Sequence, residues 1–228
     1  MGRGYFVTGT DTGIGKTAIS CALLRAFAIQ GLHAVGMKPI AAGSDNGQWL
    51  DVEQLFAAGN VQVTRKQINP YAFDPPVSPH IAAHQAGIEI DLSIIRQAYQ
   101  QLSDKADIVI VEGVGGFLVP IHPQQTGADL ARALNLPVIL VVGMRLGCLN
   151  HALLTAQAIR AAGLTLAGWV ANCIDPQMMV LEENIATLER QLDGPLLGVV
   201  PFDVKMDAHK TAGFMDVARL ANRGNTLI

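Results

Sequence analysis

The chain has 228 residues, of which 50% are hydrophobic and 15% are charged, and we expect residues 1–228 to form a single α/β domain with a large buried core. A net charge of -3 and a pI near 6.0 provide no basic surface for nucleic acid. The longest apolar run, around residues 136–142, is too short to span a bilayer, so we expect neither nucleic-acid nor membrane partners.

The first predicted strand and helix enclose a glycine-rich loop. Residues 5–8 form an apolar run and residues 16–30 a helical pattern, and between them the sequence reads Gly-Thr-Asp-Thr-Gly-Ile-Gly-Lys-Thr. This order is typical of a phosphate-binding loop, although Thr10 stands where the standard spacing has its first glycine. We expect the loop to bind a nucleoside triphosphate, with Lys16 on the β and γ phosphates and Thr17 on Mg²⁺.

The second predicted strand, residues 34–39, ends in a lysine and a proline. Lys38 would face the same crevice as Lys16, where two ammonium groups could stabilise a phosphoryl group in transfer. An ordinary exposed lysine is the alternative. Asp51 begins a helical stretch, where an N-terminal cap is the default explanation. Farther along, residues 69–80 contain four prolines and predict a rigid extended loop.

The third predicted strand, residues 108–112, follows a predicted helix at 94–102 and ends in Glu112 and a glycine-rich turn. In enzymes with phosphate loops, an acid at such a strand end holds Mg²⁺ directly or through water. An acid that only caps the next element is the alternative. Glu112 is therefore a candidate magnesium ligand.

The second half of the chain continues the alternation. Strands are predicted at 138–142, 166–172 and 197–200, with helices at 128–134, 150–162 and 180–192 and a short ordinary tail at 221–228. The strands are continuous apolar runs, as in parallel sheets covered on both faces. The sequence predicts a doubly wound, mostly parallel α/β fold with helices on both faces of the sheet and ligands at the carboxyl ends of its strands.

The three cysteines, Cys21, Cys148 and Cys173, are isolated in the sequence. An odd number without a Cys-x-x-Cys pair favours reduced thiols, and no signal-peptide pattern precedes the first strand, so we expect a cytoplasmic protein. Cys148 is interpreted as a packed side chain, and His151 as a helix-start residue, because neither has a neighbour that suggests a nucleophile or metal site. The helix start at 147–151 would suit a carboxylate or phosphate.

An ordered set of segments resembles the dethiobiotin synthetase family of the biotin pathway. The segments run over most of the chain: Gly9-Thr-Asp-Thr through Lys16-Thr17, Lys38-Pro39, Asn69-Pro70-Tyr71, Ser78-Pro79-His80, Val111-Glu112-Gly113, Gly147-Cys148-Leu149-Asn150-His151 and Gly168-Trp169-Val170-Ala171-Asn172. The phosphate loop alone is shared with many ATPases, whereas the ordered set is far more specific.

The resemblance implies an ATP-dependent ligase with a phosphate-loop NTPase fold. In that family, 7,8-diaminononanoate takes up CO₂ as a carbamate, the γ-phosphate of ATP activates the carbamate as a mixed anhydride, and the second amine closes the ring. The products are dethiobiotin, ADP and phosphate. The family's members are homodimers that bind the diamine near the subunit interface, with its carboxylate at a helix N-terminus.

The resemblance also implies a set of site residues. Thr17, Asp51 and Glu112 match the family's Mg²⁺ ligands, and Lys16 and Lys38 match its catalytic pair. The implied nucleotide-binding residues are Gly13, Ile14, Gly15, Lys16, Thr17, Ala18, Asp51, Glu112, Gly113, Val114, Gly115, Asn172, Cys173, Pro201, Phe202 and Asp203, of which Asn172 and the last three would face the adenine. The implied diamine-binding residues are Thr12, Lys38, Ala42, Gly147, Cys148, Leu149, Asn150 and His151.

Three positions depart from the family's pattern. Gly13 stands where some members carry a glutamate, Ala42 replaces a serine that can contact the diamine, and Arg145 takes a place that can hold lysine. Ser44 lies close enough in the sequence to compensate for Ala42. We expect activity to be retained, with an altered substrate affinity.

Three other functions remain open at this point. A partitioning-type deviant phosphate-loop ATPase would have a signature lysine where this chain has Asp11, and would act on DNA or membranes. An amide-forming relative, such as the synthetase domain of cobyrinic acid amidases, would need a source of ammonia. A non-catalytic paralogue is disfavoured by the intact set Lys16, Thr17, Lys38 and Glu112.

Overall fold

The computed structural model describes residues 2–204 and 207–221, so most of the predicted C-terminal tail, at 222–228, lies outside the described residues. Its centre is a six-stranded sheet in which every neighbouring pair is parallel. The order across the sheet is β10-β9-β8-β1-β5-β2. The strands are β1 (Arg3–Gly9), β2 (Ala34–Met37), β5 (Ile108–Gly116), β8 (Val138–Met144), β9 (Leu166–Cys173) and β10 (Leu196–Val200).

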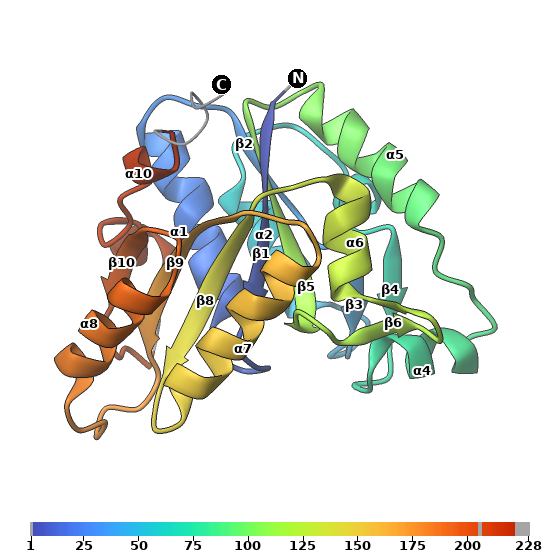
Figure 1. Cartoon of the computed structure of the whole chain (residues 1–228). Helices are drawn as coiled ribbons and strands as arrows, with labels where there is room; N and C mark the ends of the chain where they lie inside the picture. Colours follow the sequence, from blue (N-terminus) through green and yellow to red (C-terminus); the bar gives the residue numbers. More distant parts are fainter. Residues whose placement is uncertain (1, 205–206, 222–228) are drawn as a thin grey trace.

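Helices cover both faces of this sheet, and Figure 1 shows α7 on the near side and α1 on the far side. The far-side core includes residues of α1 (Lys16–Ile29), α2 (Leu50–Ala58), α9 (Ala208–Ala212) and α10 (Ala218–Ala221). The near-side core includes residues of α5 (Leu92–Ser103), α6 (Gly127–Leu134), α7 (Cys148–Ala161) and α8 (Leu181–Gln191). The doubly wound fold predicted from the sequence is confirmed.

Alternate residues of the central strand explain why the middle of each predicted strand is a continuous apolar run. In β1, Phe6 belongs to the near-side core, whereas Tyr5 and Val7 belong to the far-side core. All three are buried. A strand that buries both faces needs apolar residues at every position, which is the continuous pattern seen in the sequence.

The order of the strands places the phosphate loop at the carboxyl end of an interior strand of the sheet. β1 lies between β5 and β8, and the chain leaves β1 at Gly9 to enter the loop before α1. The connection from β1 leads to β2 and β5 on one side, while later strands extend the sheet on the other. Such a reversal point at the carboxyl ends of parallel strands is where ligands bind in open α/β sheets.

The segment predicted to be a rigid extended loop is only partly one, so that prediction is corrected. Residues Tyr71–Phe73 form β4, which pairs in parallel with β3 (Ile40–Ala42), and α4 (Pro79–Gln85) begins within the segment. Proline is favoured at the first turn of a helix, because its fixed φ suits the helix and no N–H is required there. Pro79 therefore starts a helix, and the irregular part of the segment is limited to the residues outside β4 and α4.

Other short elements and boundaries also differ from the expectation. The predicted strand 34–39 ends at Met37, because the Lys38 N–H donates to the Ile68 carbonyl outside the main sheet. α5 begins at Leu92 instead of 94, because the Asp91 carboxylate caps it by accepting from the Ser93 N–H at 2.7 Å. Among the elements that were not predicted from the sequence are α3 (Arg65–Ile68), β6 (Pro120–His122) and β7 (Gln125–Thr126). No described helix has the length and apolar character required to cross a bilayer.

The tight packing between β8 and the phosphate loop makes a testable prediction. A Cβ built on Gly143 would lie 2.6 Å from Ile14 Cγ2 and 2.8 Å from Ile174 Cδ1, and Ile14 is buried within the loop. We expect Gly143→Ala to lower the free energy of unfolding by about 1–3 kcal/mol in urea titrations, because the core is overpacked.

The matched control is Gly116→Ala, since a Cβ on Gly116 would meet its nearest neighbour, the Gly9 carbonyl oxygen, at 3.7 Å. The control is expected to change the free energy of unfolding far less. Equal losses of stability in the two variants would contradict the packing argument.

Candidate functional site

The phosphate loop, residues 9–17, is shaped to receive an anion. Gly13 and Gly15 have φ of +73° and +84°, a left-handed conformation that glycine adopts without steric cost. Gly15 is the N-cap of α1, and no side chain of the described residues caps the start of this helix. The uncapped N–H groups at the start of α1, together with the positive end of its dipole, form a site suited to phosphate.

A buried charge cluster lies beside the loop. Lys38 Nζ contacts Glu112 Oε1 at 2.6 Å and Asp51 Oδ2 at 2.8 Å, and it donates to the Gly113 carbonyl at 3.3 Å. Thr17 Oγ1 donates to the same Glu112 Oε1 at 2.9 Å. The structure therefore brings together Thr17, Lys38, Asp51 and Glu112, which come from four separate segments of the chain.

Because the cluster is buried, the charge state of Lys38 depends on the carboxylates beside it. Lys38 is 4% exposed and Glu112 is 1% exposed. Burial alone would lower the pKa of Lys38, but the carboxylates of Glu112 and Asp51 outweigh it, so the pKa is raised and the ammonium form is held. Asn69 fixes the backbone here, because its Nδ2 donates to the Lys38 carbonyl at 2.6 Å.

The oxygen atoms of this cluster fit a magnesium ion. Glu112 Oε2 is buried and has no hydrogen-bond partner among the described residues, so one carboxylate oxygen is available for a further ligand. No group of three or more His, Cys, Asp or Glu side chains suited to a metal occurs within residues 2–204 and 207–221. Beside nucleotides, Mg²⁺ is usually bound by a few protein oxygens, such as carboxylates and a threonine hydroxyl. Phosphate and water oxygens fill most of its coordination positions.

The second lysine approaches from the loop itself. Lys16 Nζ donates to the Asp11 carbonyl at 3.0 Å, and the side chain is largely buried. Burial, and next the charge of Lys38, lower the pKa of Lys16 to about 8. Phosphate oxygens placed in the loop would stabilise its charged form.

The residues expected near the adenine lie at neighbouring strand ends. Asn172 and Cys173 end β9, and Asn172 Nδ2 donates to the Ile14 carbonyl at 2.7 Å. Pro201, Phe202 and Asp203 follow β10 and are exposed. The Asn172 side chain thus holds the backbone of the phosphate loop at Ile14, a contact that was not predicted from the sequence.

The start of α7 lies next to the phosphate loop. Gly147 is its N-cap, and within the part of the chain that the structure describes no side chain caps it. Cys148 is buried, whereas Asn150 and His151 are exposed. Arg145 Nη2 donates to Asp11 Oδ2 at 2.6 Å, so the segment before α7 touches the loop directly. The Thr12 N–H, and also the Arg145 guanidinium, hold the pKa of Asp11 below its usual value.

The remaining expected diamine-binding residues are less closely tied to the cluster. Ala42 ends β3, and the Ser44 hydroxyl donates to Asp74 Oδ1 at 2.8 Å, an interaction that competes with any contact to a substrate. Thr12 lies near Gly115, since a Cβ on Gly115 would be 3.6 Å from Thr12 Oγ1. Asp11 and Asn69 were not among the expected site residues, although both belong to segments that carry the resemblance.

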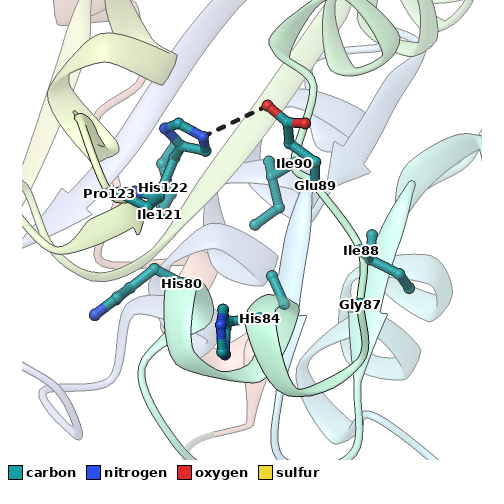
Figure 2. A pocket seen from close by; sticks show the side chains of 10 residues that line it. His80, His84, Gly87, Ile88, Glu89, Ile90, Ile121, His122 and Pro123 are labelled. Atoms are coloured by element: carbon teal, nitrogen blue, oxygen red, sulfur yellow. Dashed lines mark ion pairs between the residues drawn. The ribbon is translucent and has the colours of Figure 1, made fainter.

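A separate pocket of about 270 Å³ lies away from this cluster (Figure 2). Its wall includes His80, His84 and His122, and His122 Nε2 lies 3.6 Å from Glu89 Oε1. None of the residues lining it belongs to the phosphate loop or to the charge cluster. The chemistry expected from the sequence is therefore not located in this pocket.

Curated relatives resemble the chain over almost its whole length. A protein of Nitrosospira multiformis named ATP-dependent dethiobiotin synthetase BioD is 62% identical over 220 residues, which cover 96% of this chain and 97% of the relative. A protein of Aromatoleum aromaticum with the same name is 55% identical, covering 92% of this chain and 95% of the relative. A third, from Ralstonia nicotianae, is 50% identical, covering 96% and 97%.

Solved structures support the fold at much lower identity. The septum site-determining protein MinD of Pyrococcus horikoshii, in complex with Mg-ADP, superposes with a TM-score of 0.60 at 16% identity, covering 99% of this chain and 97% of that one. A ParA family ATPase of Chlorobium tepidum gives a TM-score of 0.58 at 12% identity, covering 98% and 94%. A family model described as an AAA domain matches residues 3–210. With relatives up to 62% identical along nearly the full chain, this protein belongs to the dethiobiotin synthetase family.

Proposed function

We propose that this protein catalyses the Mg-ATP-dependent conversion of 7,8-diaminononanoate and CO₂ to dethiobiotin, ADP and phosphate. The observation that carries the proposal is the buried Lys38, which contacts Glu112 and Asp51 beside Thr17 of the phosphate loop. Family membership supplies the reaction, and this cluster supplies the groups that a phosphoryl transfer requires.

The reaction needs ATP for a chemical reason. One amine of the diamine attacks CO₂ and loses a proton to give a carbamate, whose oxygen is a poor leaving group. The carbamate oxygen attacks the γ-phosphorus, ADP departs, and a carbamic-phosphoric mixed anhydride forms. The second amine then attacks the carbonyl carbon, the C–O bond to phosphate breaks, and loss of a proton leaves the cyclic urea.

Lys16 and Lys38 are the groups that stabilise charge in these steps. Both side chains are buried, so their ammonium charges act with little screening from water. They are held before the substrates arrive, Lys38 by the Glu112 and Asp51 carboxylates and Lys16 by the Asp11 carbonyl. Preorganised charges of this kind stabilise a transferring phosphoryl group without reorganisation during the reaction.

Thr17, Asp51 and Glu112 would hold Mg²⁺. The ion supplies charge neutralisation and orientation of the phosphates. The buried Glu112 Oε2 supports this assignment, since a buried polar oxygen without a hydrogen-bond partner among the described residues is costly unless a further ligand binds it. The nucleotide would lie along Gly13 to Ala18, reach Gly113 to Gly115, and place its adenine by Asn172, Cys173 and Pro201 to Asp203.

The diamine would extend from Lys38 and Thr12 towards Ala42, with its carboxylate at the start of α7, at Gly147 to His151. The uncapped N-terminus of α7 supports a carboxylate at that end. We further propose that the protein acts as a single-domain subunit of a homodimer that binds the diamine near the interface. A cytoplasmic location is consistent with the three unpaired cysteines, Cys21, Cys148 and Cys173.

Phosphate release measured with and without the diamine tests the proposed function. Purified protein with MgATP and bicarbonate should release phosphate only when 7,8-diaminononanoate is present, and mass spectrometry should detect an equal amount of dethiobiotin. If the rate of phosphate release is the same with and without the diamine, and no cyclic urea is formed, the result would instead favour the partitioning-type ATPase. Asp11, at the position of that class's signature lysine, disfavours this alternative.

Thr17→Val tests the metal assignment from the loop side. The substitution removes the hydroxyl that lies 2.9 Å from Glu112 Oε1 and keeps a side chain of similar shape. We expect the Mg²⁺ concentration for half-maximal turnover to rise by about 10- to 100-fold, since a magnesium ligand is lost. If the Mg²⁺ concentration for half-maximal turnover is unchanged, Thr17 is not a ligand of the metal.

A further inference from the structure

One ion pair joins two loops to which we assign different substrates. Arg145 Nη2 donates to Asp11 Oδ2 at 2.6 Å, across 134 residues of sequence. Asp11 lies in the phosphate loop, and Arg145 lies two residues before Gly147, the N-cap of α7. The side chains of Arg145 and Asp11 are 44% and 46% exposed, and ion pairs this exposed contribute little to stability. The role of this ion pair is therefore better inferred from its position, because it joins the phosphate loop to the segment that leads into α7.

Asp11 also contacts the lysine that would bind phosphate. Its carbonyl accepts from Lys16 Nζ at 3.0 Å, and its Oδ1 accepts from the Thr12 N–H at 2.7 Å. Phosphate oxygens are stronger acceptors than a neutral carbonyl for an ammonium group. ATP would therefore draw Lys16 Nζ away from the residue that Arg145 holds.

The neighbouring contacts restrict how the loop can respond. The Thr10 N–H donates to the Val141 carbonyl at 3.0 Å, and Thr10 Oγ1 accepts from the Gly143 N–H at 3.3 Å. The loop is thus anchored to β8 on one side of Asp11 and enters α1 on the other. A change at Asp11 is transmitted most directly through its side chain, which Arg145 contacts.

We propose that Asp11 and Arg145 are positioning residues that couple ATP binding to diamine binding. The inference rests on the proposed function, because it requires the start of α7 to hold the diamine's carboxylate. Nucleotide in the phosphate loop takes Lys16 away from Asp11, so Arg145 becomes the cation that Asp11 retains, and this pairing fixes the segment that leads into α7. Each ligand then binds more tightly when the other is present, by the same factor.

Calorimetric titration of 7,8-diaminononanoate, with and without a nonhydrolysable ATP analogue and Mg²⁺, measures this coupling. We expect the analogue to tighten diamine binding to the wild-type protein by about fivefold or more. In Asp11→Asn and Arg145→Gln this ratio is expected to fall below about twofold, with a raised KM for the diamine and a nearly unchanged kcat. Arg145→Lys should keep most of the ratio, because an ammonium group still pairs with Asp11.

The double variant Asp11→Asn/Arg145→Gln should lose no more coupling than either single variant, since both remove one shared interaction. The matched control is Arg160→Gln, which removes an exposed ion pair with Asp193 at the other end of α7 and should keep the wild-type ratio.

Three results would overturn the inference: an unchanged ratio in Asp11→Asn, an equal loss in Arg160→Gln, or an Arg145→Gln variant whose diamine binding is weakened by the same factor with and without the analogue, so that the ratio stays at its wild-type value. The last result would mean that Arg145 contacts the diamine itself. A wild-type protein that forms dethiobiotin but shows no coupling also contradicts the inference while leaving the proposed function intact. A wild-type protein that forms no dethiobiotin contradicts the proposed function instead.

Discussion

Lys38→Ala is expected to lower kcat by about two to three orders of magnitude while changing the Kd of ATP by less than about threefold. Lys38 is the buried ammonium group that both Glu112 and Asp51 contact, so its loss removes a preorganised charge from the phosphoryl-transfer site. ATP affinity is expected to persist, because the backbone of the phosphate loop and Lys16 remain. Steady-state kinetics and nucleotide titration measure the two quantities separately.

Two further variants make this result interpretable. Lys66→Ala removes an exposed lysine of α3 and should change neither quantity. Lys38→Arg keeps the charge but alters its shape and hydrogen-bonding geometry, so it should retain more activity than alanine and less than wild type. Circular dichroism tests whether Lys38→Ala is folded, which matters because the substitution leaves a buried carboxylate without its lysine partner. Parallel losses of turnover and ATP affinity in the folded variant would show that Lys38 binds nucleotide or supports structure.

Glu112→Gln is expected to reduce turnover at ordinary Mg²⁺ concentrations by about two orders of magnitude. The amide keeps the shape of the side chain and an acceptor for Thr17, but it removes the charge carried by the unpartnered Oε2. The Mg²⁺ concentration for half-maximal turnover should rise accordingly, and a titration with MgCl₂ at fixed ATP measures it.

Asp51→Asn serves as the graded comparison. The side chain of Asp51 is 30% exposed and that of Glu112 is fully buried, so solvent can replace part of what Asp51 contributes. We expect a smaller increase in the Mg²⁺ requirement, about 10-fold. Identical Mg²⁺ titrations for wild type and Glu112→Gln are incompatible with a metal site at Glu112.

The parallel sheet could be predicted because each of its strands is a continuous apolar run. The short strands β3 and β4 could not, since three residues such as Tyr71–Phe73 are too few to show a periodicity. The start of α4 was hidden for a related reason. Pro79 reads as a loop residue in a proline-rich segment, yet proline is also favoured in the first turn of a helix.

Lys16, Thr17 and Glu112 could be identified because each has a local signal, a glycine-rich loop or the end of an apolar run. The predicted end of the third strand at Glu112 was wrong, however, since β5 continues to Gly116. The contact between Lys38 and Asp51 has no such signal, because it depends on the path through β3 and into α2. The pair of Asp11 and Arg145 is farther still from any local pattern, because its members are 134 positions apart in the sequence. Local chemistry was thus readable from the sequence, whereas long-range pairing needed the structure.

Turnover with MgATP, the diamine and ¹⁸O-labelled CO₂, quenched before the label exchanges with water, tests the central claim most directly. If ATP activates a carbamate at this site, the carbamate oxygen leaves with the phosphoryl group. Mass spectrometry should then find dethiobiotin and phosphate in equal amounts, with one ¹⁸O atom transferred to the phosphate. Dethiobiotin accompanied by unlabelled phosphate would contradict carbamate activation, and labelled CO₂ that never enters a cyclic urea would contradict the synthetase function itself.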